Sequence, residues 1–484
     1  EMKVYIYYIY KNVLVDNGII NTDNMDTNDS VYVNWDENES ISLKELLTYA
    51  LTKNWIDMDK LTAEKYSSLQ EAYDSLLEYI SNYISNDTGF GKKVYRYMIS
   101  SGSISGWEVC MMLYEQGVLE PSGSAYEGLS SGRMSAYDFM INAITEKTIT
   151  PAQLALEPCS GSAVVADPDT GELLALVSYP GYDNNRLSGT VDKDYYEQLR
   201  NDKAKPLINK ATSLRTAPGS IFKPCSAITG LEQGVISTGE SIVCTGQYTA
   251  VTPSPKCWIY PRSHGAENVS TAIRDSCNVF FYTVGHRLGM ESGGTYNSTK
   301  GTDLLKNYAE QLGLATKSGV EIYEMDPHPS DRDAVASAIG QGTHAYSAIN
   351  LCRYVSTLAT SGVCHDFTLV SKITDYNGNV IRDNEPVVSN TMNVSSSTWN
   401  AVHQGMRLVI ENTASFKGLP YQAAGKSGTA QENTNKADHI TFISYAPYDN
   451  PEVAVSVLIP NGYASSNAAK LTSDIYKIYW GLDK

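Results

Sequence analysis

The sequence lacks any long hydrophobic run, and this absence limits what its 484 residues can do. A helix needs about 20 apolar residues to cross a bilayer, so the chain as given is predicted to contain no membrane span. The chain also begins without Met, and its first segment, EMKVYIYYIYKN, is too short and too rich in Tyr to act as a secretion signal. We therefore expect further sequence upstream.

Positive charge is scarce as well. Asp and Glu number 54 against 37 for Lys and Arg, which gives a formal net charge of −17. Nucleic-acid binding needs a basic face, so we expect no nucleic-acid partner. The eight cysteines are too few for a disulfide scaffold and form no C-x-x-C pair, so their number does not define the compartment.

The character of the sequence changes near residue 150. Before that point, segments such as SLKELLTYALTKNW and SGWEVCMMLYEQG carry apolar residues at helical spacing and no set of catalytic groups. After it, SAVVADP and ELLALVSYP flank a turn and predict a hairpin, and strand-like runs return in FTLVSKITDY, HITFISYAP and VAVSVLIP. We predict a mostly helical accessory domain over 1–150 and an α+β domain over 151–484, whose sheet joins its first and last segments.

Within the second domain, Ser220 and Lys223 stand three positions apart in TAPGSIFKPCSAITG. On a helix this spacing puts both side chains on one face, near an N-terminus that favours negative charge. Ser220 can be a nucleophile beside a lysine base, provided that burial makes the amine neutral. It can equally be a helix cap beside a solvated lysine, and the pair alone does not decide.

Two further motifs favour the catalytic interpretation. Ser276-Cys277-Asn278 precedes an apolar run that looks helical, and it offers a hydroxyl and an amide. Lys426-Ser427-Gly428-Thr429 lies among small residues before strands, where a glycine lets another backbone approach and a lysine with hydroxyls suits a carboxylate. Similar triplets at 317–319 and 465–467 lack this context, and we interpret the first as structural.

With these three motifs in this order, the chain resembles the penicillin-binding proteins, most of all the class B, monofunctional D,D-transpeptidases of peptidoglycan synthesis. The resemblance covers roughly residues 155–484 and extends to AVVADPDTGELLALVSYPGYDNN and IGQGTHAYSAINL. It implies an antiparallel sheet flanked by helices, as in serine β-lactamases, and a non-catalytic pedestal or dimerisation-like domain over residues 1–150. Ser427 stands where the common motif has Thr, and the hydroxyl is kept.

The resemblance also implies a role for each motif residue. Ser220 is expected to be the acylated nucleophile and Lys223 its general base, while Ser276 and Lys426 relay the proton to the leaving D-Ala amine. Asn278 is expected to bind the amide of the stem peptide. Ser427, Gly428 and Thr429 are expected to bind substrate, the two hydroxyls holding the terminal carboxylate. The backbone N–H groups of Ser220 and Thr429 are expected to form the oxyanion hole.

A second group of residues, Cys244, Cys257, His264 and Cys277, has the donor types of a tetrahedral Cys₃His zinc site. The spacings are longer than those of a zinc finger, and some elongation-type class B proteins carry a zinc at the corresponding place. A Cys244–Cys257 disulfide and four unconnected residues remain as alternatives. Catalysis itself is expected to need no cofactor. The other cysteines, at 110, 159, 225, 352 and 364, are predicted to be buried thiols.

We therefore expect an extracytoplasmic transpeptidase whose membrane anchor lies upstream. Its expected partners are stem peptides with a D-Ala-D-Ala donor and an amine acceptor, β-lactams, and a membrane glycosyltransferase. A β-lactamase or a β-lactam sensor on the same fold are the alternatives. No E-x-x-x-N-type signature for a deacylating water is found, which disfavours the β-lactamase.

Overall fold

The computed structural model describes residues 2–36, 38, 40–61, 68–146, 148–149, 160–430, 437–462 and 464–482. The chain divides into two compact units, Glu1–Gln153 and Leu154–Lys484. The domain boundary expected between residues 150 and 151 lies outside the described residues, as does Cys159. Within the described part, every helix is too short or too polar to span a bilayer.

The first unit is helical, as the apolar spacing predicts. Ser42 and Ser105 each begin a helix with a capping box, in which the side chain binds the N–H of a glutamate three residues later. Two small apolar clusters hold the unit together. Its elements are α1 (Met2–Tyr8), η1 (Ile9–Val15), η2 (Thr22–Asn24), α2 (Ser30–Asp36), α3 (Leu43–Thr52), η3 (Met58–Lys60), α4 (Leu69–Asn86), α5 (Thr88–Ser100), α6 (Gly106–Glu115), α7 (Gly123–Ser130) and α8 (Ala136–Thr145).

The second unit is built on a five-stranded antiparallel sheet in the order β2-β1-β11-β10-β9. The first two strands pair with each other, and β1 pairs with β11, so the beginning and the end of the unit meet as predicted. The strand β9 is the edge that carries the Lys426 motif. The strands are β1 (Gly161–Ala166), β2 (Leu173–Tyr179), β9 (Ala424–Ala430), β10 (His439–Ala446) and β11 (Val453–Ile459).

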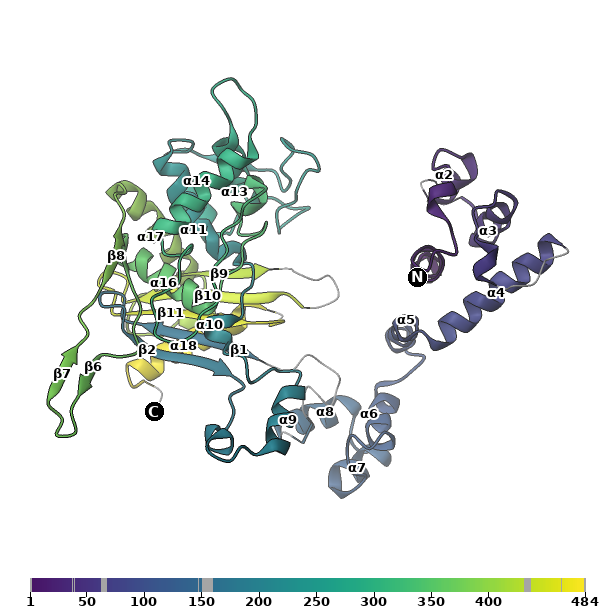
Figure 1. The fold of residues 1–484 in the computed structure, drawn as a ribbon, viewed down its shortest axis with the longest axis horizontal. Helices are drawn as coiled ribbons and strands as arrows, with labels where there is room; N and C mark the ends of the chain where they lie inside the picture. The colour runs from purple at the N-terminus through teal and green to yellow at the C-terminus, as the bar shows by residue number, and fades with distance from the viewer. Residues whose placement is uncertain are drawn as a thin grey trace. The chain divides into compact units, whose positions relative to one another are not determined.

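Helices cover both faces of this sheet (Figure 1). Along β11, Ala454 and Leu458 face one apolar cluster while Val455 and Val457 face the other, because successive side chains alternate between the faces. The first cluster packs under α16, and the second packs under α18. The α+β prediction is thereby confirmed. The helical elements are η4 (Asn184–Leu187), α9 (Lys193–Asn201), α10 (Lys210–Ser213), η5 (Gly219–Phe222), α11 (Lys223–Glu232), α12 (Val269–Arg274), α13 (Asn278–Gly289), α14 (Ser298–Gln311), α15 (Ala334–Ser337), α16 (Ala348–Ala359), α17 (Ser396–Glu411), η6 (Ala414–Phe416) and α18 (Ser465–Tyr479).

One predicted strand differs from the structure. Of the run FTLVSKITDY, only Lys372–Thr374 forms a strand, β6, which pairs with β7 (Val380–Asp383) in a hairpin outside the main sheet. Phe367, at the start of the run, is buried in the main core, but β6 and β7 are exposed along their whole length, so the later apolar residues of the run have no core to join. The remaining short strands are β3 (Ile242–Cys244) with β4 (Gly265–Glu267), and β5 (Val363–His365) with β8 (Val388–Thr391).

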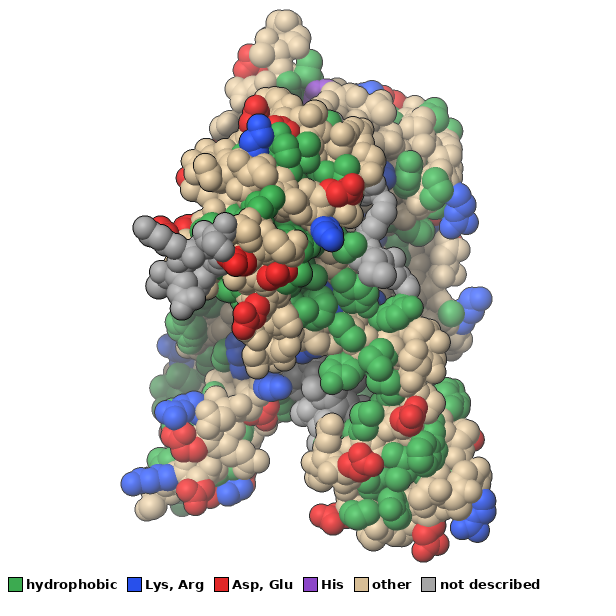
Figure 2. Space-filling model, turned by 90° about the vertical axis from the view of Figure 1, so that its right-hand side faces the viewer, with side chains coloured by type: hydrophobic (Ala, Val, Ile, Leu, Met, Phe, Trp, Pro, Cys, Tyr) green, Lys and Arg blue, Asp and Glu red, His purple; other side chains and the backbone are tan. Residues whose placement is uncertain are grey.

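Charged side chains are dispersed on the face that Figure 2 shows, where basic and acidic groups lie among uncharged ones. In the interior, Cys110, Cys225, Cys352 and Cys364 are buried free thiols, as predicted. Burial raises the pKa of Cys110 and, far more strongly, that of Cys225, which keeps both thiols protonated.

Candidate active site

Ser220 lies in η5, a single turn that leads directly into the buried helix α11. Pro224 stands at the start of this helix, where its missing N–H costs no hydrogen bond, and Gly234 follows the helix end with φ of 66°. The sequence therefore places Ser220 at a helix N-terminus, as predicted. The residue before it, Gly219, has φ of 56°, a left-handed conformation that suits glycine.

The turn at Ser220 is clamped between two other backbones. The Gly219 N–H donates to the Gly340 carbonyl over 3.0 Å. A Cβ atom at Gly219 would lie 2.9 Å from the carbonyl carbon of Thr429, and one at Gly340 would overlap Gly219 itself. Glycine at both positions lets the loop after α15 and the edge strand β9 approach the nucleophile turn closely.

Lys223 is fully buried at the first position of α11. Its Nζ atom lies 2.7 Å from the Ser276 carbonyl oxygen, 2.7 Å from Asn278 Oδ1 and 3.0 Å from Ser276 Oγ. Burial lowers the pKa of Lys223 to about 7, because the charged amine loses its hydration. The amine is therefore accessible in its neutral form near physiological pH, which a general base requires.

A second buried lysine reaches the same hydroxyl. Lys426 Nζ lies 3.2 Å from Ser276 Oγ and donates to the Ser427 carbonyl over 2.9 Å. Burial, and then the nearby charge of Lys223, lower the pKa of Lys426 well below its usual range. Ser276 Oγ thus lies between two amines, where a hydroxyl can donate to one while it accepts from the other.

Ser276 itself has an uncommon backbone conformation, with φ of 53° in the turn between α12 and α13. The N–H of the next residue, Cys277, donates to the Ala272 carbonyl over 3.0 Å, and the Ser276 carbonyl receives the Lys223 amine. This turn places Asn278 at the first position of α13. The three residues of the motif are held by contacts from separate elements.

The edge strand β9 presents the third motif to the same space. Lys426 and Gly428 are buried, whereas Ser427 and Thr429 line an open cavity of about 1000 Å³ together with Ser220, Ser276 and Asn278. A Cβ atom at Gly428 would lie 2.6 Å from the Pro218 carbonyl oxygen, so this glycine admits the turn that carries Ser220. The structure thus brings the residues predicted from all three motifs together.

The cavity also has walls that the sequence motifs did not single out. They include Trp258, Arg274, Asp275, Asp438 and Gln341. Arg274 and Asp275 form an ion pair at 2.7 Å, and the Trp258 indole N–H donates to the Asp275 carbonyl. Of these, Gln341 lies in IGQGTHAYSAINL, a segment over which the resemblance extends, whereas the others are common residue types without distinctive spacing.

The triplets at 317–319 and 465–467, which resemble the motifs in sequence, do not make the contacts that the motif residues make. Ser318 is buried and donates to Glu324 Oε2 over 2.7 Å, which is a structural contact. Ser465, the first residue of α18, does line the cavity, but Asn467 in the same helix donates to the Gly462 carbonyl in the loop before it.

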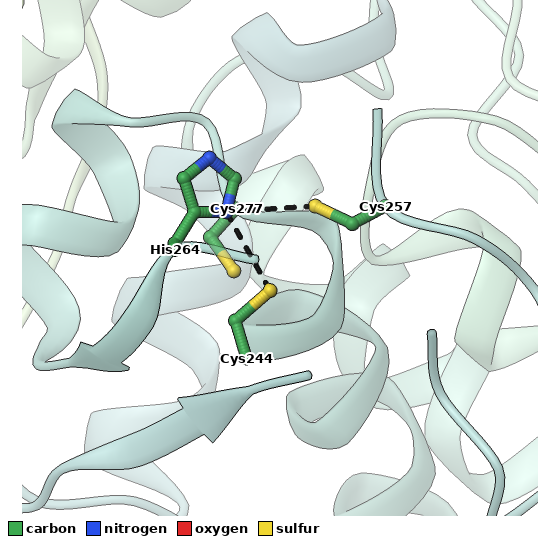
Figure 3. Close-up of side chains that lie close together, drawn as sticks. All are labelled: Cys244, Cys257, His264 and Cys277. Atoms are coloured by element: carbon green, nitrogen blue, oxygen red, sulfur yellow. Dashed lines mark hydrogen bonds between the residues drawn. The ribbon is translucent and has the colours of Figure 1, made fainter. Parts of the chain in front are cut away.

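The four residues of the second predicted group also converge. The donor atoms of Cys244, Cys257, His264 and Cys277 all lie within 4.8 Å of one another (Figure 3). His264 Nδ1 is 3.5 Å from Cys244 Sγ and 3.7 Å from Cys257 Sγ. Both cysteines of the alternative disulfide are free thiols in the structure. Cys244 ends β3 and Cys257 lies in the loop that follows it. His264 directly precedes β4, and Cys277 lies in the Ser276 turn.

This cluster fits a structural metal. Tetrahedral Zn²⁺ with Zn–S bonds of about 2.3 Å has sulfur–sulfur edges of roughly 3.8 Å, so the four donors need only a small contraction. A hydrogen bond between the two thiols lowers the pKa of Cys257 and raises that of Cys277, so Cys257 is the thiol of this pair that ionises first. The Asn278 N–H donates to Cys257 Sγ over 3.3 Å, so the cluster is joined to the Ser276 turn.

Known proteins resemble this chain over the same region. The "Peptidoglycan D,D-transpeptidase MrdA" of Haemophilus influenzae is 29% identical over 362 residues, which are 67% of this chain and 53% of the relative. The structure of Pseudomonas aeruginosa PBP2 in complex with WCK 5153 is 26% identical with a TM-score of 0.58, covering 66% of this chain and 71% of that one. A structure concerning "polymerization and crosslinking by a peptidoglycan synthase complex" is 26% identical with a TM-score of 0.59, covering 67% and 56%.

The chain thus spans about half the length of the curated MrdA relative that it matches. The family described as "Penicillin binding protein transpeptidase domain" matches residues 161–477, which include the sheet, all three motifs and the cysteine cluster. Because this match covers more than half of the sequence, the chain belongs to the family of penicillin-binding protein transpeptidase domains.

Proposed function

We propose that the protein is a peptidoglycan D,D-transpeptidase, which joins stem peptides through an acyl-enzyme on Ser220 and releases terminal D-Ala. The observation that carries this proposal is the position of Ser276 Oγ between two buried lysine amines, at 3.0 Å and 3.2 Å, beside the cavity that Ser220 lines. The membership of the family and the activity named for its MrdA relative support it.

In the first step, Ser220 Oγ attacks the carbonyl carbon of the penultimate D-Ala, and the neutral amine of Lys223 accepts the hydroxyl proton. A neutral amine has two N–H groups and one lone pair. The two N–H groups suit the 2.7 Å contacts to the Ser276 carbonyl and Asn278 Oδ1, which can only accept. The lone pair is thereby left for a proton.

In the second step, the bond to the terminal D-Ala breaks and its nitrogen takes up a proton. The protonated Lys223 amine gives its proton to Ser276 Oγ, which passes one on by way of Lys426. The contacts of Ser276 Oγ with both amines form a continuous path for this transfer. The products are free D-Ala and an ester on Ser220. An amine of a neighbouring strand then attacks the ester carbonyl, forms the cross-linking amide and restores the Ser220 hydroxyl.

Substrate binding is assigned to the cavity walls. Ser427 and Thr429 hold the terminal carboxylate, and Gly428 keeps the strand close to Ser220. Asn278 accepts from Lys223 through Oδ1 and its side chain also hydrogen-bonds Tyr282, so one N–H of the Nδ2 group is left to donate to a carbonyl of the stem peptide. The N–H groups of Ser220 and Thr429 form the oxyanion hole, consistent with the close approach of β9 to the turn at Gly219.

Turnover of a stem-peptide mimic tests the proposal. A peptide ending in D-Ala-D-Ala, supplied with an amine acceptor, should yield free D-Ala and the new amide, and Ser220→Ala should yield neither. Hydrolysis of nitrocefin over many turnovers would instead indicate a β-lactamase, because a transpeptidase gives little beyond a burst. D-Ala release that persists in Ser220→Ala would contradict the assigned nucleophile.

We infer that the metal of the Cys₃His cluster is a structural zinc. Three thiolates and an imidazole favour zinc among the common divalent metals, and four protein ligands leave no position for substrate. Bound there, zinc would supply a rigid cross-link between β3, the loop before His264 and the Ser276 turn. Catalysis itself is proposed to use no cofactor.

The remaining assignments concern the protein's setting. We infer that residues 1–150 form a non-catalytic pedestal or dimerisation-like domain, because every catalytic residue proposed above lies in the second unit. Stem peptides and β-lactams are the proposed ligands, and a membrane glycosyltransferase is the proposed partner, supported by the likeness to a chain of a synthase complex. We infer that the protein acts at the extracytoplasmic face of the cell membrane, where stem peptides are cross-linked.

A further inference from the structure

A second cavity adjoins the one that Ser220 lines. It has a volume of about 570 Å³, and Ile339 and Gln341 form part of both linings. Its other walls come from the loop around Pro253, from Tyr282 on α13 and from Asp333 at the start of α15. A peptide bound along the larger cavity can therefore place a side chain in this one without leaving the protein surface.

The electrostatic character of this second cavity is negative. Among the described residues that line it, Asp333 is the one charged group, and no Lys, Arg or His is present. The neighbouring basic residues are engaged elsewhere. Arg332 pairs with Asp331 at 3.6 Å, and Lys256 Nζ lies 4.4 Å from the centre of the Tyr260 ring. The His286 ring lies 4.9 Å from that of Tyr296 but is hydrogen-bonded to the Tyr248 hydroxyl, and burial lowers its pKa.

Asp333 is held in place by the backbone. Its Oδ1 atom accepts from the Ala336 N–H over 3.0 Å and caps α15. Its φ of 55° is a left-handed conformation, which Asp tolerates better than most residues. The hydrogen bond from Ala336 orients the exposed carboxylate at the cavity, and the side chains of Tyr282 and Tyr296 line the same cavity.

The proposed reaction defines which cation can reach this cavity. We take the acceptor amine to be a side-chain amine of the neighbouring stem peptide. Because neighbouring strands are chemically alike, the donor peptide then carries the same amine. During acylation that amine does not react and is protonated at neutral pH. An enzyme that binds such a donor gains affinity from a fixed carboxylate near the path of the peptide.

We infer that the cavity between Asp333, Tyr282 and Tyr296 is the binding site for the side-chain ammonium group of the donor stem peptide. This inference rests on the proposed transpeptidase function. Asp333 is a specificity-determining residue: it selects donors with a free amine and takes no part in the chemistry at Ser220.

The test compares two peptidyl thioester donors that end in D-Ala, one with a free lysine side chain and one with the same lysine Nε-acetylated. Thiol release without an acceptor amine reports on donor use alone. The wild-type chain should show a kcat/KM about two- to five-fold higher for the free amine, and the preference should shrink at high salt. Asp333→Asn should bring the ratio close to one. Asn can keep both the cap and the left-handed backbone.

Asp303→Asn is the matched control, because Asp303 is an exposed carboxylate on α14 that lines neither cavity. It should leave the ratio unchanged. Labelling of Ser220 by a fluorescent penicillin is measured in parallel and reports separately on the proposed function. If penicillin labels Ser220 but the ratio is the same in Asp333→Asn as in the wild type, or neither donor is consumed, the inference is overturned. If Ser220 is not labelled at all, the proposed function fails first.

Discussion

Lys223 Nζ lies 2.7 Å from Asn278 Oδ1, although 55 positions separate the two residues in the sequence. The contact joins the first residue of α11 to the first residue of α13 and orients both side chains at once. It directs the amine toward Ser276 and leaves the other end of the amide for substrate. The Ser220–Lys223 motif and the Ser276–Asn278 motif are each weak indications of function when taken alone, and this hydrogen bond joins them in one site.

Replacing Lys223 by Arg tests its role as a base. Arginine keeps the positive charge and can still donate to Asn278, but it does not lose its proton in a protein. We expect acylation by a fluorescent penicillin to slow by about 10²- to 10⁴-fold, the range typical for loss of a general base. Circular dichroism and thermal melting check that the variant is folded. Acylation within a few-fold of wild type would show that Lys223 does not accept the proton.

The dependence of acylation on pH follows from the same lysine. Lys223 must be neutral to accept a proton, and its pKa is lowered to about 7. The second-order rate constant for penicillin labelling should therefore rise with pH, with a midpoint near 7, and should be lowest in acid. The observed midpoint belongs to the lysine pair, because Lys426 lies beside the same hydroxyl. A rate that falls as pH rises through neutrality would contradict this assignment.

The clamp on the nucleophile turn predicts the effect of Gly340→Ala. The new Cβ would overlap the Gly219 backbone, so the turn that carries Ser220 must shift. We expect a loss of roughly 2–3 kcal/mol of stability and a labelling rate at least about ten-fold lower. Gly378→Ala is the matched control: its φ of 85° is similar to the 79° of Gly340, but a Cβ there meets open space. Equal labelling rates for the two variants would contradict the clamp.

The cysteine cluster predicts a metal content. The protein purified without chelators should contain about one zinc per chain, and Cys244→Ser should lose most of it because one of four ligands is removed. Melting temperature and labelling rate should both fall, since Cys277 belongs to the Ser276 turn. Cys110→Ala, in the first unit, should keep its zinc. A wild-type chain without zinc, or Cys244→Ser with full zinc, would contradict the assignment.

Much of the site could be predicted from the sequence because its residues stand in short motifs. Ser220 and Lys223 share one turn, Ser276 and Asn278 bracket one residue, and Lys426 begins a run along one strand. The short distances along the sequence therefore already predict that Ser220 lies near Lys223 and that Ser276 lies near Asn278. The sheet was predictable for a similar reason, since the runs that form β1 and β11 are apolar on both faces.

Other features depend on contacts between distant segments and leave no local signal. The clamp of Gly340 on Gly219, the left-handed backbone of Ser276 and the cavity at Asp333 each require segments that only the fold brings together. The run that contains β6 was predicted as an ordinary strand because its apolar pattern does not reveal that the hairpin lacks a partner. The four metal donors were predictable as residue types, whereas their convergence within 4.8 Å was not.

The identity of the acylated residue tests the central claim most directly. The protein is incubated with a penicillin, digested and analysed by mass spectrometry. We predict one adduct per chain, equal in mass to the penicillin and located on Ser220 in the peptide that contains TAPGSIFK, with none in Ser220→Ala. An adduct on another residue, or one that persists in Ser220→Ala, would contradict the account.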